Sequence, residues 1–280
     1  METNFSILYF FTFISIISSV VPRPGIGIKS LASPLDRLGG IKFVNADTGI
    51  LNDFDDILKA AKDKRKFILF LTHLGDLTSW ELGQKISYFL PALEKSNTQV
   101  IAVAPATIQN SNLFEKFTKF PKKLLYLDER AESFAAMNFK RGVIPNAPLS
   151  PYFKLLLMLA GIGSDGTMKE VLRGYFGDRF TPTRNNWIAE TLRIVSQERF
   201  DAVGENRYLR PFELATVRLQ NMLDIIPNWN SLIPQDSRLI TQLGGGYLLD
   251  FNNEILYSHV DTGILNYTDI DKVLDLIGVD

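Results

Sequence analysis

The order of apolar segments in the middle of the chain constrains its fold more than any other feature. Three short apolar runs, at residues 67–71 (FILFL), 99–104 (QVIAVA) and 124–127 (LLYL), each fit a buried strand. The segments between them carry apolar residues at helical spacing. Because strands connected through helices pair in parallel with right-handed crossovers, this region predicts a parallel α/β unit.

Both connecting helices have signals at their expected ends. Thr78 followed by Glu81 forms a capping box, which predicts that a helix begins directly after the 72–77 loop. Ser111 is placed to cap the next helix, and Pro121 is placed to stop it. Each helix is therefore expected to follow its strand after a short loop.

The C-terminal part predicts antiparallel strands. Residues 247–249 and 254–259 flank an Asp- and Asn-rich stretch at 250–253, as the strands of a hairpin flank its turn. Thr268 is placed to cap a last amphipathic helix. Strand–helix–strand–helix–strand, then a hairpin and a helix, is the order of the thioredoxin-like fold, an α/β class with a central mixed sheet flanked by helices.

A large helical insertion precedes the hairpin, at about residues 143–240. Its helix signals are Ser150–Pro151, a capping box of Thr167 and Glu170, an apolar pattern that starts at Trp187, and Pro211 in a first helical turn. About four helices are expected. The sequence leaves open whether they cover the sheet, bind a partner or lie on a membrane.

The N-terminal part has a different character. An uncharged apolar run begins at Phe5 and ends at Val21, which is at the lower limit for crossing a bilayer. A cleaved secretory signal is disfavoured, because an acidic residue and no Lys or Arg precedes the run. A Pro-, Gly- and Ser-rich linker follows, so residues 1–40 are predicted to form a hydrophobic segment and linker, and residues 41–280 the thioredoxin-like domain. A membrane anchor, an organelle-targeting remnant and a buried segment all remain open, and the cations after the run place the domain on the cytoplasmic side or, in a plastid, on the stromal side.

Composition excludes several classes of function. The 280 residues include no cysteine, so this chain has no disulfide, no thiolate metal site and no catalytic thiol of its own. Lys and Arg total 30 against 31 Asp and Glu, and no long basic block occurs, so no nucleic-acid partner is predicted.

Several segments resemble the AhpC/TSA peroxiredoxin-like proteins, and they occur in that family's order. They are residues 67–81 (FILFLTHLGDLTSWE), 99–104, 117–128 (FTKFPKKLLYLD) and 244–261 (GGGYLLDFNNEILYSHVD). The helical insertion resembles that of a cyanobacterial and plastid branch. The resemblance implies a thioredoxin-like fold and, for members that keep their cysteines, antioxidant peroxide reduction.

In this comparison the residues of the family's redox site are altered. Asp76 stands at the place of the reactive cysteine, and Ser79 at that of a second cysteine. His73 stands at the place of the family's usual threonine, and Gly75 directly precedes Asp76. Gly245 or its neighbour stands where many thioredoxin folds have a cis-proline. A carboxylate at a helix amino terminus is stabilised by the helix dipole, but it cannot reduce a peroxide or form a mixed disulfide.

Two motifs that suggest other chemistry are better explained as turns. Residues 161–166 match the dinucleotide-binding pattern G-x-G-x-x-G, but residues 153–160 before it favour a helix over a strand, so a turn between two helices is predicted. The sequence D-T-G-I-L, repeated at Asp47 and Asp261, resembles the paired loops of aspartic proteases. Those enzymes are all-β, so two Asp-initiated turns are predicted instead.

His73 and His259 are the only two histidines. Together with Asp76 they could ligate a metal ion, but hydrogen-bonded structural roles are favoured, so no metal and no cofactor is predicted.

The sequence thus predicts a peroxiredoxin-like protein that has lost thiol redox activity and binds an unknown protein partner or small ligand. Two alternatives stay open. One is an enzyme of changed chemistry that uses His73 and Asp76 in a loop pocket, and the other is a scaffold anchored to a membrane by the run from Phe5 to Val21.

Overall fold

The computed structural model describes residues 33–196 and 208–279. From Leu35 onward these residues belong to one compact unit. The apolar run from Phe5 to Val21 lies outside the described residues. Among those that are described, no helix is long and apolar enough to cross a membrane.

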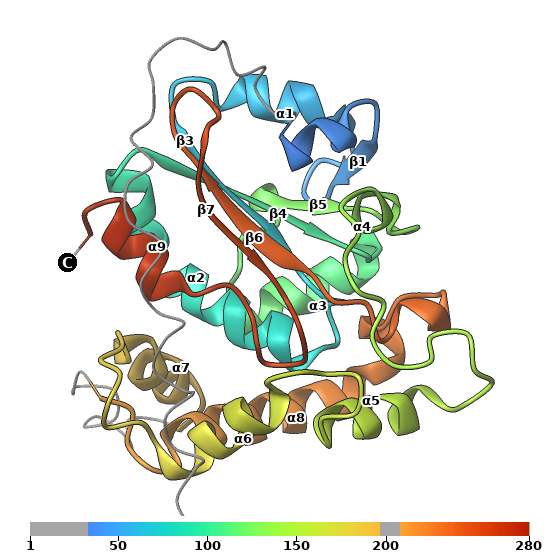
Figure 1. Ribbon diagram of the computed structural model, residues 1–280, viewed down its shortest axis with the longest axis vertical. Helices are drawn as coiled ribbons and strands as arrows, with labels where there is room; N and C mark the ends of the chain where they lie inside the picture. The colour runs from blue at the N-terminus through green and yellow to red at the C-terminus, as the bar shows by residue number, and fades with distance from the viewer. Residues whose placement is uncertain (1–32, 197–207, 280) are drawn as a thin grey trace, which may run out of the picture. The chain divides into compact units, whose positions relative to one another are not determined.

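A seven-stranded sheet forms the centre of this unit, with the strand order β2-β1-β5-β4-β3-β6-β7 (Figure 1). Its strands are β1 (Lys42–Asn45), β2 (Leu51–Asp53), β3 (Arg65–Phe70), β4 (Thr98–Ala104), β5 (Leu125–Leu127), β6 (Gly245–Leu249) and β7 (Ile255–Val260). Strands β3, β4 and β5 run parallel, whereas β1, β2, β6 and β7 each pair antiparallel with their neighbours. This confirms the predicted fold class, a central mixed sheet flanked by helices.

The central strand β3 explains why its sequence is so apolar. It pairs with β4 on one side and with β6 on the other. Because successive side chains of a strand point to opposite faces, Phe67 and Leu69 enter the core on one face, and Ile68 and Phe70 the core on the other. Burial on both faces leaves no position for a polar side chain in this run.

Different helices cover the two faces. The face of Phe67 and Leu69 is covered by α2 (Leu77–Lys95), α3 (Ile108–Thr118) and α9 (Ile270–Leu276), and the other face by α1 (Phe54–Ala60) and α4 (Glu132–Ala136). Short 3₁₀ helices lie at Pro34–Leu38, Lys122–Leu124 and Ser237–Leu239.

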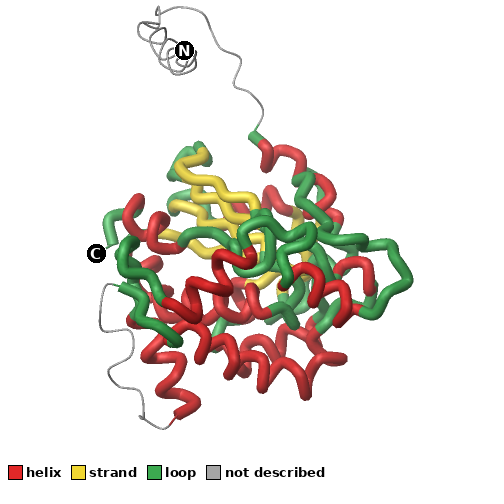
Figure 2. The backbone as a smooth tube through the Cα atoms, turned by 60° about the horizontal axis from the view of Figure 1, so that its bottom comes forward, coloured by secondary structure: helices red, strands yellow, loops and turns green. Residues whose placement is uncertain are grey.

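The insertion between α4 and β6 contains α5 (Pro151–Leu159), α6 (Thr167–Phe176), α7 (Asn186–Ser196) and α8 (Glu213–Leu232). Helix α8 contacts α2 and α3, and α7 contacts α2. The insertion therefore lies over the helices that cover one face of the sheet, on the side away from the strands (Figures 1 and 2).

The first two strands and α1 were not predicted from the sequence. Strands β1 and β2 have only four and three residues, which is too short for a clear period of alternation in the sequence. Their place at the edge of the sheet depends on pairing between β1 and β5, which are far apart in the chain.

Three predicted helix caps outside the 72–77 loop are wrong by one to four residues. Helix α3 is capped by Thr107, whose reciprocal partner is Asn110, rather than by Ser111. Helix α9 is capped by Asp269 rather than by Thr268. Helix α6 begins at Thr167 after Gly166, which has a φ of 85°. The Thr167 hydroxyl instead donates a hydrogen bond of 2.8 Å to the Ile264 carbonyl, so its role is to hold the C-terminal segment.

Candidate functional site

The loop between β3 and α2 carries most of the predicted site residues. Asp76 is the N-cap of α2, because its Oδ1 accepts a hydrogen bond from the Thr78 backbone N–H at an N···O distance of 3.2 Å. The predicted cap at Thr78 is therefore wrong. The Thr78 Oγ1 instead accepts a hydrogen bond from the Leu265 backbone N–H at 3.0 Å and so links α2 to the C-terminal segment.

Other polar groups of this loop bond within the loop and the start of α2. Ser79 is fully buried, and its hydroxyl forms a hydrogen bond of 2.7 Å with Thr72 Oγ1. The Trp80 indole N–H donates a hydrogen bond of 2.7 Å to the Leu74 carbonyl. The loop is thus fixed from inside by its own side chains.

His73 lies in the interior of the protein. It is fully buried, its Nδ1 accepts a hydrogen bond of 3.2 Å from the Gly75 N–H, and its ring meets that of Trp229 edge to face. Burial lowers the pKa of His73, and the Asp76 carboxylate opposes this effect in part. The histidine is therefore held in its neutral form.

The end of α8 covers the loop. A Cβ atom on Gly75 would lie 3.2 Å from the Leu232 side chain and 3.3 Å from that of Ile233, so no larger residue fits here without a shift. Trp229, on the same helix, contacts His73. The expectation of a loop pocket at His73 and Asp76 does not match this packing.

Gly245 lies in β6 opposite Phe70 of β3. Its neighbour Gly244 approaches the Phe70 carbonyl so closely that a Cβ atom would lie 1.8 Å from the oxygen. The Gly244 N–H donates a hydrogen bond of 3.2 Å to Asp261 Oδ2. No peptide bond among the described residues is cis.

Asp261 is a site residue whose environment the sequence did not predict. Its carboxyl group is buried, and Oδ1 lies 3.4 Å from His259 Nε2. Burial raises the pKa of Asp261 well above its usual range, and the negative charge of Asp76 raises it further. The two carboxyl groups are therefore electrostatically coupled. The only signal in the sequence was that Asp76 follows the central strand β3 and Asp261 follows the edge strand β7, which lie on either side of β6.

The remaining sequence motifs do not assemble into a site. Asp47 is exposed in the turn between β1 and β2, at the opposite edge of the sheet from Asp261, so the two D-T-G segments are not a catalytic pair. Within residues 33–196 and 208–279, no three His, Asp or Glu side chains are placed to hold a metal ion, so His73, His259 and Asp76 are not brought together as ligands. The G-x-G-x-x-G match is a turn between α5 and α6.

A cavity of about 830 Å³ lies on another side of α2, away from the 72–77 loop. It is open to solvent on one side and is lined by α2, α6, α7, the connection between α6 and α7, and the C-terminal segment. Apolar and aromatic side chains line it together with charged ones; among them are Leu172, Phe176, Trp187, Tyr257, Glu81, Lys85, Arg173, His259 and Tyr267.

A buried ion pair lies beneath this cavity. The Arg218 guanidinium donates hydrogen bonds of 2.7 Å and 3.2 Å to the two carboxylate oxygens of Glu81. Its third contact, of 2.7 Å, goes to the Glu170 carbonyl of α6. The Tyr267 hydroxyl donates a hydrogen bond of 2.5 Å to Glu81 Oε1. The Glu81 carboxylate of α2 thus binds α8 and the C-terminal segment directly, and Arg218 extends the network to α6.

The environment of this network shifts the pKa values of its members. Burial raises the pKa of Tyr267 well above its usual value, and the Glu81 carboxylate raises it further. Burial alone would lower the pKa of Arg218, but the Glu81 carboxylate raises it. Tyr267 is therefore a neutral hydrogen-bond donor, and Arg218 is a permanent cation.

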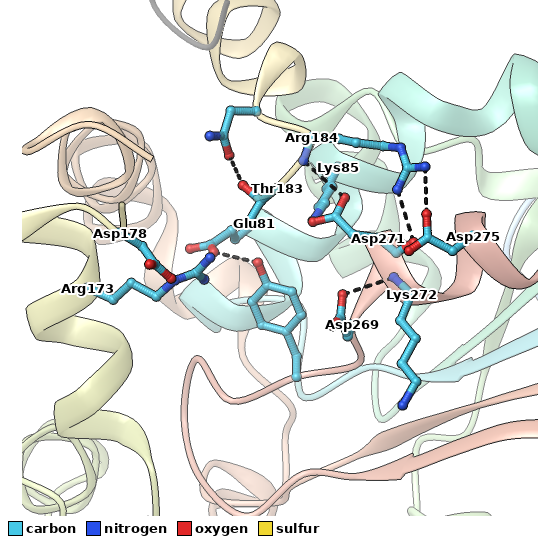
Figure 3. Close-up of polar contacts among 12 residues, drawn as sticks. Glu81, Lys85, Arg173, Asp178, Thr183, Arg184, Asp269, Asp271, Lys272 and Asp275 are labelled. Carbon is cyan, nitrogen blue, oxygen red and sulfur yellow. Dashed lines mark hydrogen bonds and ion pairs between the residues drawn. The ribbon is translucent and has the colours of Figure 1, made fainter. Parts of the chain in front are cut away.

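Further ion pairs surround the cavity (Figure 3). Lys85 of α2 pairs with Asp271 of α9 at 3.1 Å, and Arg173 of α6 pairs with Asp178 at 3.1 Å. Arg184 binds Asp275 at 2.7 Å. These cations already have carboxylate partners, so they do not form a free anion site.

The family model for AhpC/TSA antioxidant enzymes matches residues 85–263, which is more than half of the chain. The chain belongs to the AhpC/TSA family. No curated protein matches it.

The match clarifies which parts of this AhpC/TSA member carry the family relationship. It begins at Lys85 within α2 and ends at Gly263, so it includes the insertion and the hairpin but not the 72–77 loop. The correspondence of Asp76 and Ser79 with redox cysteines therefore rests on their place after β3 and at the start of α2. In this cysteine-free member of the family, Asp76 caps α2, and the buried Ser79 hydroxyl is hydrogen-bonded to that of Thr72.

Proposed function

We propose that this AhpC/TSA member does not reduce peroxides and instead binds a small molecule in the cavity between α2, α6, α7 and the C-terminal segment. One observation carries the proposal: the loop after β3 is packed beneath α8, while a cavity of about 830 Å³ lies beside the same helix α2. This volume is within the usual range of small-molecule sites.

The lining of the cavity indicates what kind of molecule fits. Leu172, Phe176 and Trp187 provide apolar surface, and His259 provides a polar group. Since Lys85 and Arg173 are already paired with carboxylates, an anionic ligand that binds these two cations would have to separate existing ion pairs. The best match is an amphipathic molecule of low net charge.

Peroxide consumption tests the first half of the proposal. With a thioredoxin reducing system, the purified protein should consume hydrogen peroxide no faster than a boiled sample, because peroxide reduction in this family needs a thiolate. Turnover at an enzyme-like rate would refute this half.

Binding of a neutral, environment-sensitive dye such as Nile red tests the second half. Leu172 and Met168 are both on α6 and are 46% and 45% exposed, but only Leu172 lines the cavity. Leu172→Glu should weaken dye binding at least tenfold, whereas the matched Met168→Glu should not. Equal effects of the two substitutions would show that the dye does not bind in the cavity.

Membrane association through the run from Phe5 to Val21 is a separate proposal, as are the cyanobacterial or plastid type and the stromal side. The proposal of membrane association rests on the apolar sequence of this run alone. Fractionation of cells that express the full chain tests it, and recovery of all the protein in the soluble fraction would refute an anchor.

A further inference from the structure

The outer surface of the insertion is unusually apolar. On α8, the four residues Leu219, Met222, Leu223 and Ile226 are 41–60% exposed. They recur at helical spacing on the side opposite Val217 and Ile225, which are buried in the core that α8 shares with α2 and α3. Helix α8 therefore presents apolar side chains both to the core and to the outside.

Helix α5 extends this apolar surface at the C-terminal end of α8. Tyr152 of α5 stacks on Trp229 of α8 with ring centroids 4.8 Å apart. Tyr152, Phe153 and Leu156 are 45–60% exposed. The seven exposed residues of the two helices are here called the α5–α8 strip.

The size of the α5–α8 strip lies at the upper end of what a monomer usually exposes. With about 150–200 Å² for each fully exposed large side chain, their exposed fractions amount to roughly 600 Å². The largest apolar patch of a typical monomer covers about 300–600 Å². One partner of a stable complex contributes about 800 Å², so the strip supplies most of the area that a dimer needs.

The absence of exposed cations on the strip indicates which kind of partner binds there. The only lysine of α5, Lys154, is buried and donates a hydrogen bond of 2.7 Å to the Pro145 carbonyl. On α8, the exposed positions between Leu219 and Ile226 carry no Lys or Arg. A helix that lies on an anionic membrane has cations on its polar side, whereas the centre of a protein interface is depleted of charge. In a two-fold dimer a residue meets its own copy or near neighbours, so an uncharged strip is complementary to itself.

We propose that the α5–α8 strip is the interface of a homodimer, in which α8 of one copy packs against α8 of a second copy around a two-fold axis. This surface is distinct from the cavity, because none of its seven residues lines the cavity.

Sedimentation velocity of the full chain over a wide range of concentrations tests the proposal. The wild-type protein should sediment with about twice the protomer mass of 31.6 kDa. The double substitution Leu223→Glu, Ile226→Glu should give the protomer mass, because it places carboxylates opposite each other across the axis. Glutamate forms helix readily, so the variant should keep the wild-type circular dichroism spectrum.

The matched control is Leu276→Glu on α9, which is 46% exposed and lies outside the strip. It should leave the dimer intact. A second arm mixes Leu223→Glu with Leu223→Lys, and the mixture should recover dimer that neither variant forms alone. A wild-type monomer at all concentrations, a dimer that survives the double substitution, or binding of the wild-type protein to phosphatidylcholine–phosphatidylserine vesicles through this strip would overturn the proposal.

Discussion

The two sides of α2 show opposite solutions to the same problem, which is how to place polar groups next to an apolar core. At its first turn, the 72–77 loop is closed by its own hydrogen bonds and by the end of α8. One to two turns further on, Glu81 and Lys85 face a cavity, and each is neutralised by a partner from a distant segment. The loop is thus stabilised locally, whereas the cavity exists only because the insertion and the C-terminal segment meet there.

Breaking the ion pair beneath the cavity should give the largest effect. Arg218→Leu leaves the buried Glu81 carboxylate without its counter-charge, which typically costs about 3–5 kcal/mol in the free energy of unfolding. Urea denaturation followed by circular dichroism measures it. Arg238→Leu is the control, because Arg238 forms its ion pair with Asp236 at the surface and should leave stability unchanged. Equal stability of the two variants would contradict a role for the buried pair.

Opening the loop should have the next largest effect. Leu232→Ala removes the fully buried part of the side chain beyond the Cβ atom that lies over Gly75, so the free energy of unfolding should fall by about 2–5 kcal/mol. His73 should then react with diethyl pyrocarbonate, measured in a His259→Gln background where it is the only histidine. Leu219→Ala, at an exposed position of the same helix, should leave His73 protected. Protection of His73 in the Leu232→Ala variant would mean that the outer part of the Leu232 side chain is not what closes the loop.

The same comparison shows what could be predicted from the sequence. The strands β3 and β4 and helix α2 were predicted because their patterns are local and strongly apolar. A role for Asp76 at the helix start was also within reach, since capping depends on neighbouring residues. In contrast, Glu81 meets Arg218 and Tyr267 from 137 and 186 positions away, and no local pattern encodes those contacts. The burial of Asp261 likewise depends on its approach to Gly244, so its sequence alone indicated only a turn.

The cap at the start of α2 should contribute a smaller amount. Asp76→Ala removes the acceptor for the Thr78 N–H and should destabilise the protein by about 1 kcal/mol. Asp76→Asn keeps an acceptor oxygen and should lose less, and it also removes the charge that raises the pKa of Asp261. Thermal unfolding of both variants at one pH measures the difference. Equal losses for Asp76→Asn and Asp76→Ala would indicate that the charge, which both variants remove, and not the capping oxygen is what stabilises the loop.

The coupling of Asp76 with Asp261 should appear as a change in the pH dependence of stability. Because the pKa of Asp261 is raised in the folded state, the folded protein retains a proton that the unfolded chain loses above about pH 4. This contribution to stability is complete below the unfolded pKa and is lost as the pH rises through the folded pKa. Asp261→Asn removes that loss, so the stability of the variant relative to wild type should increase between pH 4 and pH 7, as measured by urea denaturation at a series of pH values. The lowered pKa of His73 acts in the opposite direction, with stability lost as the pH falls below about 6.5, but it is common to both proteins and cancels in the difference. A difference that stays constant with pH would show that the Asp261 carboxyl group keeps its ordinary pKa and that the region beside the closed loop is open to water.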